Sequence, residues 1–280
     1  MSGTAAEIAV AVEAVEPWWK TRWIALPIFA AAAVAGGVAA AVARRRSPPD
    51  GPGTPDWCHP GVGILGGQLE DVDYVELRTG DAGPDEPLPM VIALHTRGMK
   101  AERIAEFASG LPGKVRVIAP VGFEDAGLGH SWTATKPDDP KYGAELQDVA
   151  AYLVNFIEAI QQCRPTLGKP VVSGYSGGAD LAFALAAEAG GQLGGSVGAA
   201  GWFPPGVGPV TSPVVVVHGR NDTAVPYDRT ANEVAARIGT TPGEPIQLVP
   251  MEGVGHSFAG ALQIKWLEQT AKAAAAQATA

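Results

Sequence analysis

The sequence has few of the residues that bind metal ions or neutralise phosphate groups. Its 280 residues include two cysteines and five histidines, which lie far apart and form neither a C-x-x-C nor an H-E-x-x-H motif. The 20 Lys and Arg residues are outnumbered by 29 Asp and Glu, which gives a formal net charge of -9. Because nucleic-acid binding depends on a basic surface, we expect no nucleic-acid partner. Because the metal-binding motifs are missing, we expect no metal site.

Other signatures are missing as well. We find no internal repeat, and no glycine-rich string opens a helix after a strand, as a dinucleotide fingerprint requires, so we expect no organic cofactor. Hydrophobic residues make up 46% and charged residues 18% of the chain, which excludes a disordered composition. The two cysteines, Cys58 and Cys163, allow one disulfide in an exported protein or two buried thiols otherwise, and the sequence does not choose between them.

A long uncharged run lies near the N-terminus. The 21 residues from Trp23 to Ala43 carry no charge and are rich in Ala, Val, Ile and Leu. As a helix they would span about 31 Å, close to the thickness of a bilayer core. We therefore expect an uncleaved transmembrane helix at residues 23–43. A cleaved secretory signal ending at Ala41-Val42-Ala43 is the alternative, and both the length of the run and Arg44-Arg45-Arg46 directly after it argue against cleavage.

A transmembrane helix at residues 23–43 would make this a single-pass membrane protein, with a short segment before the helix and a large body after it. The three arginines after the run outnumber Lys20 and Arg22 before it by one, which favours a cytoplasmic body, but one charge does not decide the side. Secretion after signal cleavage stays the alternative. The expected segments around the helix are a short N-terminal tail at 1–22, a basic and then Pro/Gly-rich linker at 44–63, a folded domain at 64–272 and an Ala-rich tail at 273–280.

Strand patterns alternate with helix patterns through the body. Apolar or alternating runs predict strands, and spacings of three and four predict helices. Such an alternation is typical of an α/β fold with a mostly parallel sheet and helices on both faces. The expected strands lie at 72–78, 89–95, 114–119, 171–172, 196–201, 213–218 and 246–250, and the expected helices at 101–107, 143–162, 226–238 and 258–273, with a further helix after residue 178.

The sequence Gly174-Tyr175-Ser176-Gly177-Gly178 lies between a predicted strand and a predicted helix. That context fits a G-x-S-x-G nucleophile elbow, in which Ser176 stands clear of the sheet at a helix N-terminus. The glycines two before and two after the serine avoid a Cβ clash in the sharp turn. A closely packed glycine-rich turn without chemistry is the alternative, since the chain holds 36 glycines.

Two further residues make the serine interpretation stronger. Asp222 follows the predicted strand 213–218, and His256 follows the predicted strand 246–250. A serine nucleophile needs a base held by a carboxylate, in the chain order Ser, Asp, His, with each at a strand end. We expect Ser176, Asp222 and His256 to form a catalytic triad. Asp228 or Glu252 in place of Asp222, and His218 in place of His256, remain alternatives.

At these residues the chain resembles single-domain serine esterases of the α/β-hydrolase superfamily, of the carboxylesterase, acyl-protein thioesterase and polyhydroxybutyrate depolymerase-like kinds. The resemblance covers about residues 70–270 and is most specific in the segment from His218 to Pro226. It implies the α/β-hydrolase fold. The backbone N-H of Gly177 is the first expected oxyanion donor, and the loop at 95–99 should supply the second. The family usually has His-Gly where this chain has His95-Thr96, so we name Arg97 as the second donor.

The substrate pocket is less well defined by the sequence. The connection from Gly201 to Pro213 is short, so we expect no large lid over the serine. Tyr175, Trp132 and Trp202 are candidates for its wall, with ordinary core positions as the alternative.

We expect a membrane-anchored serine hydrolase that cleaves ester or thioester bonds of a small-molecule or lipid-like acyl substrate through an acyl-enzyme, without cofactor. A catalytically impaired binding domain, suggested by Thr96, and an acyltransferase that uses the same triad are the alternatives.

Overall fold

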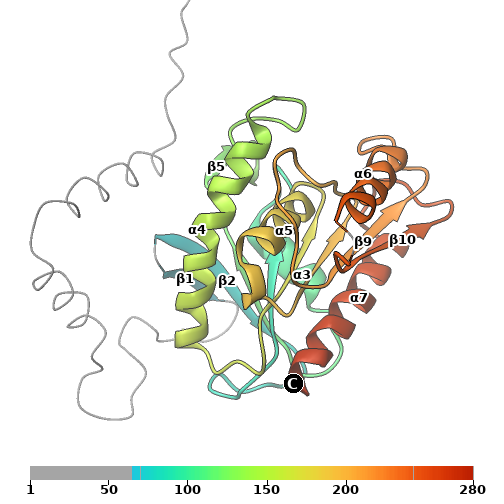
Figure 1. Ribbon diagram of the computed structural model, residues 1–280. Coiled ribbons are helices and arrows are strands. Elements are labelled where there is room, and N and C mark those ends of the chain that lie inside the picture. The colour runs from blue at the N-terminus through green and yellow to red at the C-terminus, as the bar shows by residue number, and fades with distance from the viewer. Residues whose placement is uncertain (1–64, 70, 242, 280) are drawn as a thin grey trace, which may run out of the picture. The chain divides into compact units, whose positions relative to one another are not determined.

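The computed structural model describes residues 65–69, 71–241 and 243–279 (Figure 1). The predicted tail at 1–22, anchor at 23–43 and linker at 44–63 lie outside the described residues, as does Cys58. None of the helices within the described ranges combines the length and the apolar character that crossing a bilayer requires. Cys163, the other cysteine of the chain, is disulfide-bonded.

The described domain is built on an eight-stranded sheet in the order β1-β2-β4-β3-β7-β8-β9-β10. β2 runs antiparallel to β1 and β4, and every other neighbouring pair is parallel, so the predicted mostly parallel sheet is confirmed. The strands are β1 (Leu65–Leu69), β2 (Val72–Arg78), β3 (Met90–Leu94), β4 (Arg116–Pro120), β7 (Val171–Tyr175), β8 (Gly195–Ala199), β9 (Val214–Gly219) and β10 (Ile246–Met251).

Helices cover both faces of this sheet. The residues of β7 show this, because the side chains of successive strand residues point to opposite faces. On β7, the hydroxyl of Ser173 lies 2.7 Å from that of Thr270 on α7, whereas a Cβ on the next residue, Gly174, would overlap the backbone of α5. α5 and α7 therefore lie on opposite faces. The helices are α3 (Ala101–Ala108), α4 (Tyr142–Cys163), α5 (Gly177–Glu188), α6 (Tyr227–Thr240) and α7 (Ala261–Ala278), with a short 3-10 turn at Gly190–Gln192.

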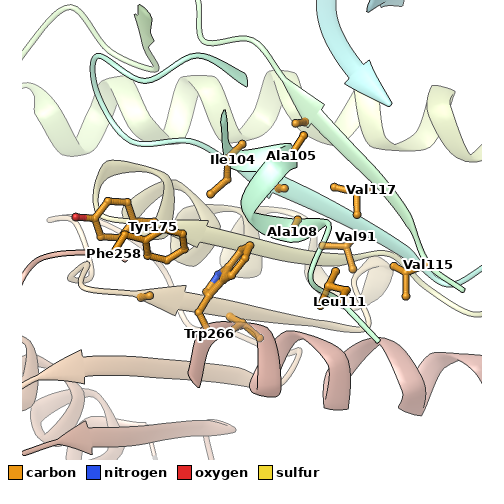
Figure 2. Packing of buried hydrophobic residues seen from close by; sticks show 14 of the residues in the cluster. Val91, Ile104, Ala105, Ala108, Leu111, Val115, Val117, Tyr175, Phe258 and Trp266 are labelled. Atoms are coloured by element: carbon orange, nitrogen blue, oxygen red, sulfur yellow. The ribbon is translucent and has the colours of Figure 1, made fainter. Parts of the chain in front are cut away.

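One apolar cluster fills the space between the sheet and the pair α3 and α7 (Figure 2). Ile104 of α3 and Trp266 of α7 are fully buried in it. At one end of this cluster the rings of Tyr175 and Phe258 stack with their centroids 4.3 Å apart. Tyr175 directly precedes Ser176, and Phe258 is two residues after His256. The core therefore extends directly beneath the predicted site.

The chain differs from the sequence-based expectations in its strands. β1 (Leu65–Leu69) is not among the expected strands, and the stretch 120–140, for which no strand is expected, holds a hairpin of β5 (Glu124–Ala126) and β6 (Gly129–Ser131), which hydrogen-bonds to the loop after β3 through His130 and Met99. In the segment expected as an Ala-rich tail, 273–280, α7 continues to Ala278. It does so because Ala274 is buried and the Gln277 side chain accepts a hydrogen bond from the backbone N-H of Lys169 at 3.1 Å.

Candidate active site

Ser176 occupies the turn between β7 and α5. Its backbone has φ 52° and ψ -121°, a conformation that L-residues rarely adopt and that is held by the surrounding structure. A Cβ on Gly174 would overlap the carbonyl of Gly178, and a Cβ on Gly178 would overlap the carbonyl of Leu94. The two glycines thus permit a turn in which the serine hydroxyl stands at the start of a helix.

Two hydrogen bonds join the three predicted residues. His256 Nε2 lies 3.2 Å from Ser176 Oγ, and His256 Nδ1 lies 2.8 Å from Asp222 Oδ2. An ionised carboxylate only accepts hydrogen bonds, so Nδ1 carries the proton and Nε2 is free to accept one from the serine. This is the protonation pattern that a serine nucleophile with a histidine base requires.

The alternatives to Asp222 do not reach the imidazole. Asp228 is exposed on α6, and Glu252 is exposed and pairs with Arg220 at 2.5 Å. Asp222 is buried, and its second oxygen, Oδ1, accepts the backbone N-H groups of Ala224 and Val225 at 2.9 Å each. The geometry therefore selects Asp222 as the partner of His256.

The loops that carry the acid and the histidine are bonded to each other. The backbone N-H of Asn221 donates to the carbonyl of Val254 at 2.9 Å, and that of Arg220 donates to Met251 at 3.0 Å. Gly219, the last residue of β9, permits this approach, because a Cβ there would overlap the Val254 carbonyl. The relative position of acid and base is thus set by backbone contacts.

His95 fixes the loop that follows β3. Its Nε2 accepts the backbone N-H of Gly122 at 3.0 Å, so its Nδ1 carries the proton and donates to the carbonyl of Thr96 at 2.9 Å. Burial lowers the pKa of His95 to about 4, which keeps the ring neutral. In a trans peptide the N-H points away from the C=O. With the Thr96 carbonyl held by His95, the Arg97 N-H of the same peptide points to the opposite side.

That opposite side is the space beside Gly177. A Cβ on Gly177 would lie 3.8 Å from the backbone nitrogen of Arg97. Among the described residues, no hydrogen-bond acceptor faces the Arg97 N-H, and the N-H of Gly177 opens α5 and has no acceptor within the helix. Two backbone donors therefore flank one region next to Ser176. The Arg97 side chain turns away and donates to Ser131 Oγ at 3.0 Å.

The three candidate pocket aromatics are all buried. Trp132 stacks on His95 with ring centroids 4.5 Å apart and donates from Nε1 to the His95 carbonyl at 2.7 Å. Tyr175 donates from its hydroxyl to the carbonyl of His256 at 2.6 Å. Trp202 has the ring of Tyr142 parallel to it with centroids 6.4 Å apart, and the Arg229 guanidinium lies 3.2 Å from its centroid. All three hold loops of the site in place, and a role in substrate contact stays a prediction.

The sequence analysis missed a buried acid beneath the serine turn. Asp180, in the first turn of α5, accepts the Tyr142 hydroxyl at 2.7 Å and the Trp202 N-H at 2.9 Å. Burial raises the pKa of Asp180 to about 7, and burial also raises the pKa of Tyr142. A signal was present, since Asp180 is the one charged residue of α5 before its last residue, Glu188.

A groove of about 410 Å³ lies beside the Arg97 loop. Its floor includes Thr96 and Met99, and Leu128 at the tip of the β5–β6 hairpin is 91% exposed at its edge. The groove is open, and the basic residues Arg97, Lys100 and Arg103 line it together with the apolar ones. Within the described residues, no cluster of histidine, cysteine, aspartate and glutamate side chains is arranged to hold a metal ion.

The strand order, the serine at the turn after β7, and the acid and histidine in the loops after β9 and β10 define the α/β-hydrolase class. Within that class the chain belongs to the dienelactone hydrolase family, whose model matches residues 130–280, more than half of the chain. It is a hydrolase that acts on esters. No curated protein matches the chain in sequence.

Solved structures share the fold at low sequence identity. The chain is similar to esterase PE8 and to a carboxylesterase from Bacillus cereus, each with a TM-score of 0.60 and 17% identity over 72% of this chain, covering 98% and 94% of those proteins. It is also similar to acyl-protein thioesterase 2 from Zea mays, with a TM-score of 0.56 and 17% identity over 72% of this chain and 98% of that protein.

Proposed function

We propose that this protein is a serine esterase that cleaves carboxylic ester or thioester bonds through an acyl-enzyme, with Ser176 as nucleophile. The observation that carries the proposal is the chain of hydrogen bonds from Asp222 through His256 to Ser176, at 2.8 Å and 3.2 Å. A serine hydroxyl is a weak nucleophile near neutral pH, and a histidine at this distance removes its proton as it attacks.

The proposed reaction has two halves. Ser176 Oγ attacks the carbonyl carbon while His256 Nε2 takes its proton, and the same nitrogen then gives that proton to the departing alcohol or thiol. Water, deprotonated by His256, attacks the acyl-enzyme and releases the acid. Asp222 holds Nδ1 protonated and stabilises the imidazolium that forms in each half.

The developing oxyanion is bound by the backbone N-H groups of Gly177 and Arg97 in this proposal. Both face the region beside Ser176, and both lack an acceptor among the described residues. Loss of one such donor costs on the order of 100-fold or more in rate. Thr96 does not prevent this arrangement, because its carbonyl is turned toward His95.

The groove beside Arg97 supports a small-molecule or lipid-like acyl ester as substrate. Arg97, whose N-H is the proposed oxyanion donor, is one of its lining residues, and Met99 and Leu128 give an alkyl chain apolar surface beside the basic Lys100 and Arg103. Residues 200–213, between β8 and β9, form no helix, which leaves the serine without a helical lid from this segment.

We also propose that residues 23–43 anchor the protein in a membrane, with residues 1–22 as a tail and 44–63 as a linker to the domain. The uncharged run and its arginine flank support this layout. The full chain should stay in the membrane pellet after alkaline carbonate extraction. A supernatant form whose N-terminus begins at Arg44 would instead identify a cleaved signal.

Fluorophosphonate labelling tests the catalytic proposal. The wild-type chain should take up one label, and Ser176→Ala and His256→Ala should take up none while keeping the wild-type unfolding temperature. A short p-nitrophenyl ester should be hydrolysed only by the wild type. The proposal is wrong if Ser176→Ala labels as well as the wild type. Product analysis with added alcohols or amines separates hydrolysis from acyl transfer.

A further inference from the structure

We propose that His218 is a positioning residue of the site, whose imidazole N-H holds the acid loop at Val225 and lies beside the Asp222 oxygen that binds His256. The inference rests on the proposed function and adds a fourth residue to the surroundings of its acid. His218 belongs to β9, four residues before the acid, and its side chain is fully buried.

The contacts of His218 fix which of its nitrogens carries the proton. Its Nε2 lies 2.9 Å from the carbonyl of Val225 and 3.3 Å from Asp222 Oδ2. Both neighbours are acceptors, so Nε2 must be the protonated nitrogen. Its hydrogen bond goes to the Val225 carbonyl, and Asp222 Oδ2 lies beside the same N-H at ion-pair distance. Its Nδ1 is buried and has no hydrogen-bond partner among the described residues.

The surroundings keep this imidazole neutral. The charged or titratable groups that face it are Asp222 and His256, while Tyr227 of α6 packs its ring edge-on at 5.9 Å. Burial lowers the pKa of His218, which opposes a second proton at Nδ1. His218 therefore supplies a neutral donor and adds no positive charge beside the acid.

A neutral donor at this point has two consequences for Asp222. The first is orientation, because His218 holds the Val225 carbonyl while the Val225 N-H binds Oδ1, and Oδ2 accepts from His256 with His218 Nε2 3.3 Å away. The second is basicity, because an N-H dipole beside a carboxylate makes that carboxylate attract a proton less strongly. Without His218, Asp222 would hold the protonated form of His256 more tightly.

The pH dependence of catalysis should report this loss. His256 must be neutral to act as a base, so kcat/KM falls on the acid side as the imidazole becomes protonated. In His218→Leu, which removes the donor at similar volume, the acid-side midpoint should move up by about half a unit to one unit. The value of kcat/KM above that midpoint should also fall about fivefold, the effect of losing the one hydrogen bond to the Val225 carbonyl.

His218→Gln is the matched control. A glutamine amide nitrogen reaches about the same place as the Nε2 of histidine and restores the donor, so its midpoint should return to within about 0.2 units of the wild type, well inside the shift expected for a lost donor. Both variants and the wild type are measured as the full chain, with a short p-nitrophenyl ester and with their unfolding temperatures. If His218→Leu does not fold, His218→Asn replaces it, because the shorter amide does not reach Asp222.

Two outcomes would overturn the inference. One is an unchanged midpoint in the variants that lack the donor, with a rate loss that only follows the loss of folded protein. The other is a glutamine variant shifted as far as the leucine variant. Failure of the proposed function looks different, because Ser176→Ala would then hydrolyse the ester as fast as the wild type, whatever residue stands at 218.

Discussion

Asp180→Asn should remove a strong pH dependence of the folding free energy. In the folded protein the carboxyl is fully buried beneath the serine turn, and burial raises its pKa from 3.8 to about 7. Between these values the folded state keeps the proton that the unfolded state has released. Stability therefore decreases as the pH rises from about 4 to about 7, and levels off above that.

The size of the effect follows from the displacement of the pKa. One pH unit corresponds to about 1.4 kcal/mol, so a change from 3.8 to about 7 costs the wild type about 4 kcal/mol at pH 8 relative to pH 4. Asparagine keeps both hydrogen bonds, since its oxygen accepts the Trp202 N-H and its amide donates to the Tyr142 hydroxyl oxygen. The variant should become more stable than the wild type as the pH rises.

Guanidinium unfolding of both proteins from pH 4.5 to pH 8, followed by tryptophan fluorescence, measures this difference. His95 acts in the opposite direction, because burial lowers its pKa to about 4, so stability is lost as the pH falls from 6.5. That background is common to both proteins and cancels in the difference between them. A difference that stays constant over the whole range would show that Asp180 ionises normally and that the reasoning is wrong.

Three further predictions concern backbone packing at the serine turn, the second oxyanion donor and a buried ion pair. Gly178→Ala should prevent folding by overlap with backbone carbonyls, whereas Gly177→Ala should keep the wild-type unfolding temperature; similar temperatures for both would contradict this. Arg97→Pro should lower kcat by about 100-fold through loss of the N-H, and Arg97→Ala by far less, with circular dichroism confirming the fold. Glu76→Gln should cost about 3–5 kcal/mol in chemical unfolding, because Arg116 is left buried without its charge partner, and a loss below 1 kcal/mol would refute that.

The sequence predicts those parts of the fold whose cause is local. The apolar runs predict β9 and β10 within one residue at each end. For β9 the reason is that a strand buried on both faces has few alternatives to apolar residues, whereas β10 is the edge strand and is only partly buried. From those strand ends, Asp222 and His256 follow. The hairpin of β5 and β6 was missed because three-residue strands carry too little pattern, and its docking on Met99 is a contact between distant segments.

The choice of the second backbone donor shows the same limit. Sequence places it in the loop at 95–99, but which N-H faces the serine depends on where the Thr96 carbonyl points. That direction is set by the His95 ring, which is itself held by Gly122 and Trp132, 27 and 37 positions along the chain. A pattern of neighbouring residues contains no information about such a contact.

Buried aromatic side chains beneath the site stabilise it by donating hydrogen bonds to backbone carbonyls of its loops. The hydroxyl of Tyr175, one residue before the serine, binds the carbonyl of His256, and burial raises its pKa to about 12, so it remains a donor at neutral pH. Trp132 binds the carbonyl of His95 in the same way from the hairpin side. Each donor joins two segments of the site that lie far apart in the sequence. Because a serine attack depends on distances of a few tenths of an ångström, these buried donors should affect kcat more than KM, although neither touches a reacting atom.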